Sequence, residues 1–177
     1  MRPGDQERFD WIKRNLYVPA VSDILDTLGF RNQAMHQRLR PLDADNCVIV
    51  GVRDIDAIEK ENIRKAGVEV FTMRDIDERG MRAVIEETLR MAGRGTAGYH
   101  VSLDMDWIDP EDAPGVGTPV RGGATYREAH LAMEIIADHG RMLSFEIVEV
   151  NPVIDEHNRT ADLAVELTLS AFGKKIL

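Results

Sequence analysis

Short apolar runs alternate with segments of helical periodicity four times along the chain, beginning at Cys47. The apolar runs occupy residues 47–52, 68–72, 99–106 and 143–150, and the helical segments occupy residues 56–67, 79–93, 125–140 and 160–175. Apolar runs of this length, joined through helices, are typical of parallel strands that are buried on both faces. The alternation therefore predicts an α/β fold, with a parallel sheet of about four strands and helices on both faces.

The start of the chain has a different character and predicts a helical segment ahead of the sheet. Residues 6–16 carry apolar side chains at helical spacing. Pro19 can open a second short helix that ends at Gly29. We therefore expect two parts, residues 1–46 and residues 47–177.

Composition narrows the classes of partner. The 177 residues carry 31 acidic and 22 basic side chains, for a net charge of −9. Nucleic-acid binding depends on clustered Lys and Arg, so a nucleic acid is not an expected partner, whereas a cationic substrate or a divalent metal suits this charge. Cys47 is the single cysteine, so no intrachain disulfide can form. The sequence has neither a secretory signal core nor a run of about 20 apolar residues, so we expect a cytoplasmic protein with no membrane partner.

Two carboxylates close the third predicted strand, at the end of a parallel sheet where ligands gather. Asp104 and Asp106 are two residues apart, and side chains so spaced on a strand share a face at roughly 7 Å. Such carboxylates repel each other unless a positive group lies between them, and oxygen ligands suit manganese or magnesium. The pattern is also compatible with a solvated strand end, or with Asp106 and Asp109 capping a turn before Pro110.

Four motifs carry a resemblance to a known family. They are Gly-Val-Arg-Asp-Ile-Asp at residues 51–56, Ser-Leu-Asp-Met-Asp at residues 102–106, a loop with Asp-Pro, Gly-Thr-Pro and Gly-Gly at residues 109–123, and Glu-Val-Asn-Pro at residues 149–152. Together they resemble the ureohydrolases, the family of arginase, agmatinase and their relatives. Residues 47–177 are similar to the C-terminal half of an arginase, with a partial form of its three-layer fold.

The resemblance implies a binuclear manganese site and metal-assisted hydrolysis of arginine to ornithine and urea. Asp104 and Asp106 would be metal ligands. Glu149 would face the guanidinium group of the substrate, and Thr118 would lie in the active-site wall beside it.

Two further residues would select the substrate. Asp56 and Glu59 match the segment that recognises the α-amino end of the substrate in arginases, which favours arginine over agmatine. A second interpretation of this pair is a helix N-cap with its capping-box partner, and the two interpretations are compatible. Glu149 has an alternative as well, as an exposed residue at the end of a strand.

Most metal ligands of the family have no counterpart in the sequence. The resemblance implies a His after a glycine-rich turn, an Asp-x-His-x-Asp cluster and a proton-shuttling His, and none of the five histidines stands in such a setting. Two carboxylates alone bind manganese weakly, so no catalytic residue is assigned and the activity of this chain is an open question. The alternative is a non-catalytic α/β fragment or a fusion product with a role in oligomerisation.

Residues 8–44 resemble a different family. Residues 16–26, 29–35 and 40–42 are similar to the start of the 4-hydroxy-4-methyl-2-oxoglutarate aldolases and regulators of ribonuclease E activity. This resemblance predicts a chimera joined near residues 43–50, and it adds a third functional alternative, an aldolase-like or regulatory binding module. A sheet cut from a larger one exposes an edge that invites pairing, so we also expect a homo-oligomer.

Overall fold

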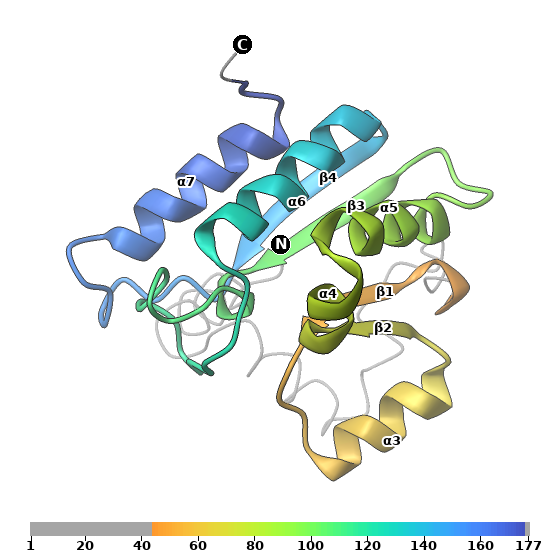
Figure 1. The fold of residues 1–177 in the computed structure, drawn as a ribbon, viewed down its shortest axis with the longest axis horizontal. Helices are drawn as coiled ribbons and strands as arrows, with labels where there is room; N and C mark the ends of the chain where they lie inside the picture. Colours follow the sequence, from red (N-terminus) through yellow and green to blue (C-terminus); the bar gives the residue numbers. More distant parts are fainter. Residues whose placement is uncertain (1–43, 176–177) are drawn as a thin grey trace, which may run out of the picture. The chain divides into compact units, whose positions relative to one another are not determined.

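Strands and helices alternate along the part of the chain that the structure describes, as the sequence predicts (Figure 1). The computed structural model describes residues 44–175, so the helices predicted within residues 6–29 lie outside the described residues. The strands are β1 (Val48–Val52), β2 (Glu69–Thr72), β3 (Tyr99–Asp104) and β4 (Met142–Val148). The helices are α3 (Ala57–Ala66), α4 (Met73–Arg79), α5 (Met81–Ala92), α6 (Tyr126–His139) and α7 (Arg159–Ala171), with short 3-10 turns at η1 (Ala44–Asn46) and η2 (Met105–Trp107).

Capping residues define both ends of α3. The amides of Ile58 and Glu59 donate to the Asp56 carboxylate at 2.6 and 2.8 Å, and the Asp56 amide donates to the Glu59 carboxylate at 3.0 Å. Gly67 ends the helix in the left-handed conformation, at φ 70°. The capping box predicted for Asp56 and Glu59 is therefore confirmed.

Helix α4 is an element that the apolar periodicity of the sequence does not predict. The Asp75 amide donates to the Thr72 hydroxyl at 3.3 Å, and the Thr72 amide donates to the Asp75 carboxylate at 2.7 Å. Gly80, at φ 83°, then separates α4 from α5. The Thr-x-x-Asp signal for this helix was present, but it begins on the last residue of β2 and so reads as the end of a strand.

The four strands form two sheets within the described residues, and the prediction of one sheet is wrong for them. β1 pairs with β2 and β3 pairs with β4, both in parallel, as predicted for strands joined through helices. No strand between residues 44 and 175 bridges β1 and β3. Hydrophobic periodicity indicates which segments are strands, but it does not specify which edges bond to each other.

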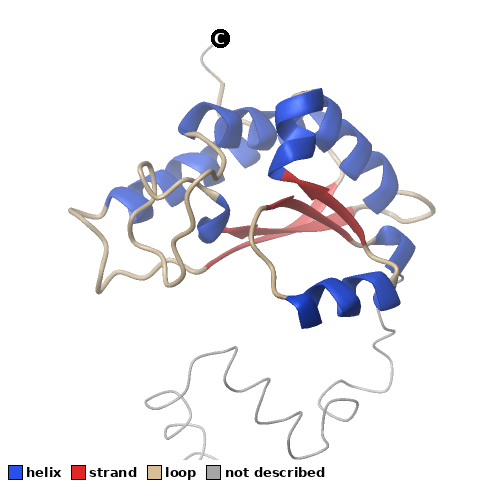
Figure 2. Cartoon of the chain, turned by 60° about the horizontal axis from the view of Figure 1, so that its bottom comes forward, coloured by secondary structure: helices blue, strands red, loops and turns tan. Residues whose placement is uncertain are grey.

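Helices supply most of the core that stabilises these short sheets. α4 packs on β1 and β2, α5 packs on β1 and on α6, and α6 packs on α7 and on β4. Figure 2 shows most of the helices on one side of the strands. The buried core side chains come mainly from α4, α5, α6, α7, β3, η2 and the loop after η2, and include Ile76, Val84, Met105, Ile108 and Leu167. No helix within residues 44–175 has both the length and the apolar character to cross a membrane.

One face of β3 and β4 is polar and exposed, and among the described residues no helix covers it, unlike the predicted arrangement with helices on both faces. His100 and Ser102 alternate with apolar residues along β3, and they pair with Ser144 and Glu146 on β4. One His100 ring nitrogen lies 2.8 Å from the Ser144 hydroxyl, and the other lies 3.3 Å from the Glu146 carboxylate. This alternation is the pattern of a sheet with one solvated face rather than two buried ones.

Candidate functional site

Asp104 is the last residue of β3, and its carboxylate shapes the turn that follows. The Asp106 amide donates to Asp104 Oδ1 at 2.8 Å, which begins η2. Asp106 therefore lies in a 3-10 turn, and the prediction that the two side chains share one face of a strand is wrong. A short acidic side chain that binds the backbone amide two residues on is a common way to end a strand in a turn.

The two oxygens of the Asp106 carboxylate have different surroundings. Oδ2 accepts a short hydrogen bond from the hydroxyl of Thr118. Oδ1 is buried and has no hydrogen-bond partner in the structure. A buried acceptor without a partner costs about 1–3 kcal/mol, and more when it is charged, so this oxygen favours a bound cation. This oxygen is therefore the atom of the site that could serve as a metal ligand.

Glu149 lies directly after β4 in a strained backbone conformation, with φ at 65°. A Cβ atom on Gly117 would lie 3.7 Å from Glu149 Oε2, so the carboxylate extends over the loop that carries Thr118. Non-glycine residues rarely adopt a positive φ, and they are enriched at functional sites when they do.

The three carboxylates influence one another. Partial burial raises the pKa of the Glu149 carboxyl, and the charges of Asp106 and Asp104 raise it further. Partial burial also raises the pKa of Asp104, with the Asp106 carboxylate acting in the same direction. Asp104, Asp106 and Glu149 therefore form an acidic cluster at the carboxyl ends of β3 and β4. The sequence placed all three at strand ends, and the structure brings them together with Thr118.

Backbone contacts hold the Thr118 loop beside this acidic cluster. Val116 forms an isolated bridge with Val150, and the Asn151 amide donates to the Gly115 carbonyl at 2.8 Å. The Gly115 amide in turn donates to the buried Thr160 hydroxyl at 2.7 Å. The Asn-Pro segment and the start of α7 thus fix the loop that carries Thr118.

Asp109, also near this turn, is a structural residue. Its carboxylate accepts hydrogen bonds from the amides of Glu111, Gly122 and Gly123 at 2.9, 2.7 and 3.2 Å. The Glu111 amide, followed by those of the two glycines, lowers the pKa of Asp109. The interpretation that this aspartate caps a turn is therefore confirmed for Asp109.

Three of the described histidines, His100, His130 and His139, have partners away from the acidic cluster. His130 is buried between α6 and α7, with one ring nitrogen 2.9 Å from the Ser170 hydroxyl, and burial lowers its pKa. His139 lies 3.0 Å from the Tyr99 hydroxyl. Within residues 44–175, no three His, Cys, Asp or Glu side chains are grouped so as to hold a metal. The described part of the chain thus offers two candidate ligands rather than a closed ligand set.

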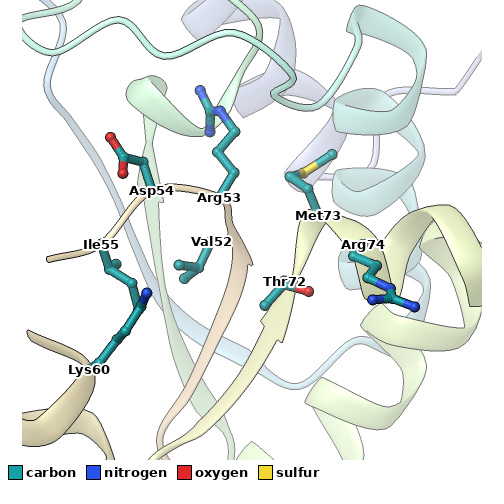
Figure 3. A pocket seen from close by; sticks show the side chains of 8 residues that line it. All are labelled: Val52, Arg53, Asp54, Ile55, Lys60, Thr72, Met73 and Arg74. Carbon is teal, nitrogen blue, oxygen red and sulfur yellow. The ribbon is translucent and has the colours of Figure 1, made fainter. Parts of the chain in front are cut away.

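Two cavities lie elsewhere on the described residues. One of about 470 Å³ lies at the carboxyl ends of β1 and β2 (Figure 3). It is lined by Val52, Arg53, Asp54, Ile55, Lys60, Thr72, Met73 and Arg74. The other, of about 450 Å³, lies around Asp109 and Thr125. Neither of the two is lined by a member of the acidic cluster.

Arg53 contacts the turn that carries Asp106, a role that the sequence did not predict. Its guanidinium group donates to the backbone carbonyls of Asp106, Trp107 and Val120. The only signal for this role was its place directly after the first predicted strand, where side chains point toward a ligand site.

Comparison with known proteins gives one consistent family. The model of the Arginase family matches residues 29–173. An arginase of Bacillus caldovelox is 47% identical over 157 residues, which cover 85% of this chain and 52% of that relative. An arginase of Bacillus subtilis is 53% identical over 133 residues, which cover 75% of this chain and 45% of that relative. The native structure of the Bacillus caldovelox arginase matches 77% of this chain and 46% of its own, with a TM-score of 0.74 and 50% identity.

The matched range starts ahead of Cys47, where the predicted similarity to arginase begins. It begins at residue 29, inside the segment 8–44 that resembles an aldolase, and it includes the predicted junction at residues 43–50. Neither an aldolase-like origin nor a chimera gains support from these comparisons. The chain spans about half the length of the relatives it matches. Because the family match extends over most of the chain and the described fold aligns with a solved arginase, the chain belongs to the arginase family.

Proposed function

We propose that this chain contributes the acidic cluster and Thr118 to the manganese-assisted hydrolysis of arginine to ornithine and urea. Family membership supports the reaction class, and the geometry at the ends of β3 and β4 supports the assignment of residues. Because the chain spans about half of its relatives, the activity of a whole arginase is a proposal for this chain.

Asp104 and Asp106 are the proposed metal ligands. The buried, unpartnered Oδ1 of Asp106 is the single observation that carries this assignment, because a cation is the group that this charged oxygen lacks. Carboxylate oxygens suit manganese, which would supply Lewis-acid polarisation to the hydrolysis when bound. The other ligands that the family resemblance implies have no counterpart in this sequence, so weak manganese binding is expected of the chain alone.

Glu149 and Thr118 are proposed to act on the substrate side of the acidic cluster. A guanidinium group carries a positive charge, and Glu149 offers a carboxylate whose pKa is raised by burial and by its two acidic neighbours. Arrival of the cation would stabilise the charged form of Glu149 and reverse that shift. Thr118 holds the Asp106 carboxylate in place through its hydroxyl.

Asp56 and Glu59 are proposed to recognise the α-amino group of arginine in addition to capping α3. Both residues are exposed at the start of a helix that follows the carboxyl end of β1. Their carboxylates are partly used by the cap, which leaves one oxygen of each for a ligand.

A cytoplasmic location and self-association of the chain also stay predictions.

Urea release tests the function directly. The full chain is incubated with manganese and arginine, or with agmatine, and urea is measured for the wild type and Asp104→Asn. Manganese-dependent release from arginine that exceeds release from agmatine, and that Asp104→Asn abolishes, is the expected result. Manganese binding without urea release would support the alternative of a non-catalytic α/β fragment. Urea release that is unchanged in Asp104→Asn would contradict the assignment of residues.

A further inference from the structure

We propose that Arg53 is the positioning residue of the acidic cluster, holding the Asp106 carboxylate against Thr118 by binding the backbone on both sides of that contact. The expected effect of Arg53 on manganese affinity rests on the proposed function, whereas its role in positioning Asp106 and Thr118 does not. Arg53 directly follows β1 and lies 53 positions before Asp106 in the sequence. Its hydrogen bonds therefore connect segments that are far apart along the chain.

The hydrogen bonds of Arg53 fall on two separate segments. On the η2 side, Nη2 donates to the Asp106 carbonyl at 2.7 Å and Nη1 donates to the Trp107 carbonyl at 3.2 Å. On the loop side, Nε and Nη2 donate to the Val120 carbonyl at 3.0 and 2.6 Å. Val120 is two residues after Thr118, so one guanidinium group fixes the backbone at both partners of the Thr118–Asp106 hydrogen bond.

Only arginine has the geometry for this arrangement. Its planar guanidinium group presents five N–H donors in a fixed fork, whereas a lysine ammonium is a compact point charge on a flexible stem. In Figure 3 the Arg53 side chain extends away from Lys60. The acceptors are neutral carbonyls, and the positive charge of Arg53 acts to lower the pKa of Asp104 and Asp109.

Close packing reinforces the same connection between β1 and η2. Gly51 lies within β1 at φ 83°, and a Cβ atom there would lie 1.9 Å from the indole nitrogen of Trp107. The turn that carries Asp106 is therefore pressed on the end of β1, and Arg53 adds directional bonds to this contact. Residues that orient metal ligands from behind commonly change metal affinity by about 10- to 100-fold when they are altered.

The test measures manganese alone, without substrate. Free manganese is titrated into the full chain and followed by electron paramagnetic resonance, for the wild type, Arg53→Lys, Thr118→Ala, the double variant and Asp106→Asn. Arg82→Lys is the matched control, because Arg82 makes an exposed ion pair with Glu86 on α5. Amide hydrogen exchange is recorded for the same proteins without metal.

We expect Arg53→Lys to weaken manganese binding by about 10- to 100-fold and Arg82→Lys to leave it unchanged. The double variant should bind no more weakly than the weaker single variant, since Arg53 acts through the Thr118–Asp106 contact. Amide exchange should accelerate at residues 105–109 and 118–122 in Arg53→Lys and stay as it is in α6 and α7.

The proposal is overturned if Arg53→Lys binds manganese as the wild type does while Asp106→Asn does not, or if the effects of Arg53→Lys and Thr118→Ala multiply. If the wild type binds no more manganese than Asp106→Asn, the proposed function fails, and hydrogen exchange alone decides on Arg53. Faster exchange confined to the two segments then supports its positioning role, and unchanged exchange overturns it.

Discussion

The two pairs of strand ends differ in how their charged groups are satisfied. At the ends of β1 and β2, capping boxes occupy the acidic side chains of Asp56 and Asp75. At the ends of β3 and β4, one oxygen of Asp106 is buried without a partner and Glu149 holds a positive φ. Polar groups without a partner and strained backbone conformations are more common at functional sites than elsewhere in a fold. The caps thus hold the acidic side chains at the first pair of ends, whereas the second pair leaves an oxygen of Asp106 available for the metal binding that we propose.

Gly51 of β1 packs against Trp107 of η2, and disrupting this contact between the two regions should have the largest effect on stability. In Gly51→Ala the new Cβ would overlap the Trp107 indole, and the residue would keep a φ of 83° that alanine disfavours. We expect a loss of about 3 kcal/mol in the free energy of unfolding, measured with urea. The matched control is Gly67→Ala, at φ 70° with nothing within 4 Å, which should cost about 1 kcal/mol. Equal losses would mean that β1 does not press on the turn after β3.

Removing the cap at the β1 end should lower stability without affecting metal. Asp56→Ala deletes the acceptor for two amides at the start of α3 and should cost about 1 kcal/mol in urea unfolding. Manganese affinity should stay at the wild-type value. A change in manganese affinity would erase the distinction drawn between the two regions.

Relieving the backbone strain at Glu149 should raise stability, by less than the loss expected for Asp56→Ala. Asparagine tolerates the left-handed region better than glutamate, so Glu149→Asn should raise the free energy of unfolding by about 0.5 kcal/mol. Glu156→Asn, at an exposed position without a positive φ, is the control and should bring no gain. A loss of stability in Glu149→Asn would show that the carboxylate, rather than the backbone, dominates at this position.

The pH dependence of stability should be the most subtle difference. Asp104 and Glu149 have pKa values raised by the fold, so each binds its proton more tightly in the folded state. Their contribution is present below the pKa of the unfolded chain, at about pH 4, and is lost as the pH rises through the raised values. The double variant Asp104→Asn/Glu149→Gln should therefore gain stability relative to the wild type as the pH rises.

Asp109 provides the contrast of opposite sign. Its pKa is lowered, so its contribution is present above the unfolded pKa and disappears as the pH falls through the lowered value. Asp109→Asn should therefore lose stability relative to the wild type as the pH rises. Urea unfolding at a series of pH values checks both variants, and parallel curves for the two would contradict the assigned shifts.

The sequence predicted the order of strands and helices because their signals are local. Capping residues, glycine stops and apolar periodicity identified α3, α5, α6 and α7 within a few residues. The pairing of strands into two sheets depends on which edges meet, and that information is not local. The solvated face of β3 and β4 is hard to predict from the sequence, because the alternation of His100 and Ser102 with apolar residues is short.

The candidate site was predicted in part for the same reason. Asp104, Asp106 and Glu149 stand at strand ends, so the sequence could place them near one another. The turn at Asp106 and the role of Arg53 could not be predicted, since both depend on backbone carbonyls that any residue carries. A long-range hydrogen bond to a backbone carbonyl cannot be predicted from the type of residue that carries the carbonyl.

A manganese titration of two aspartate variants tests the central claim most directly. Asp106 and Asp109 lie three residues apart, but the Asp109 carboxylate is occupied by backbone amides and Asp106 has a free buried oxygen. With free manganese followed by electron paramagnetic resonance, we predict that Asp106→Asn loses binding and Asp109→Asn keeps it. Binding that survives in Asp106→Asn, or that is lost equally in both variants, would contradict the proposed metal site.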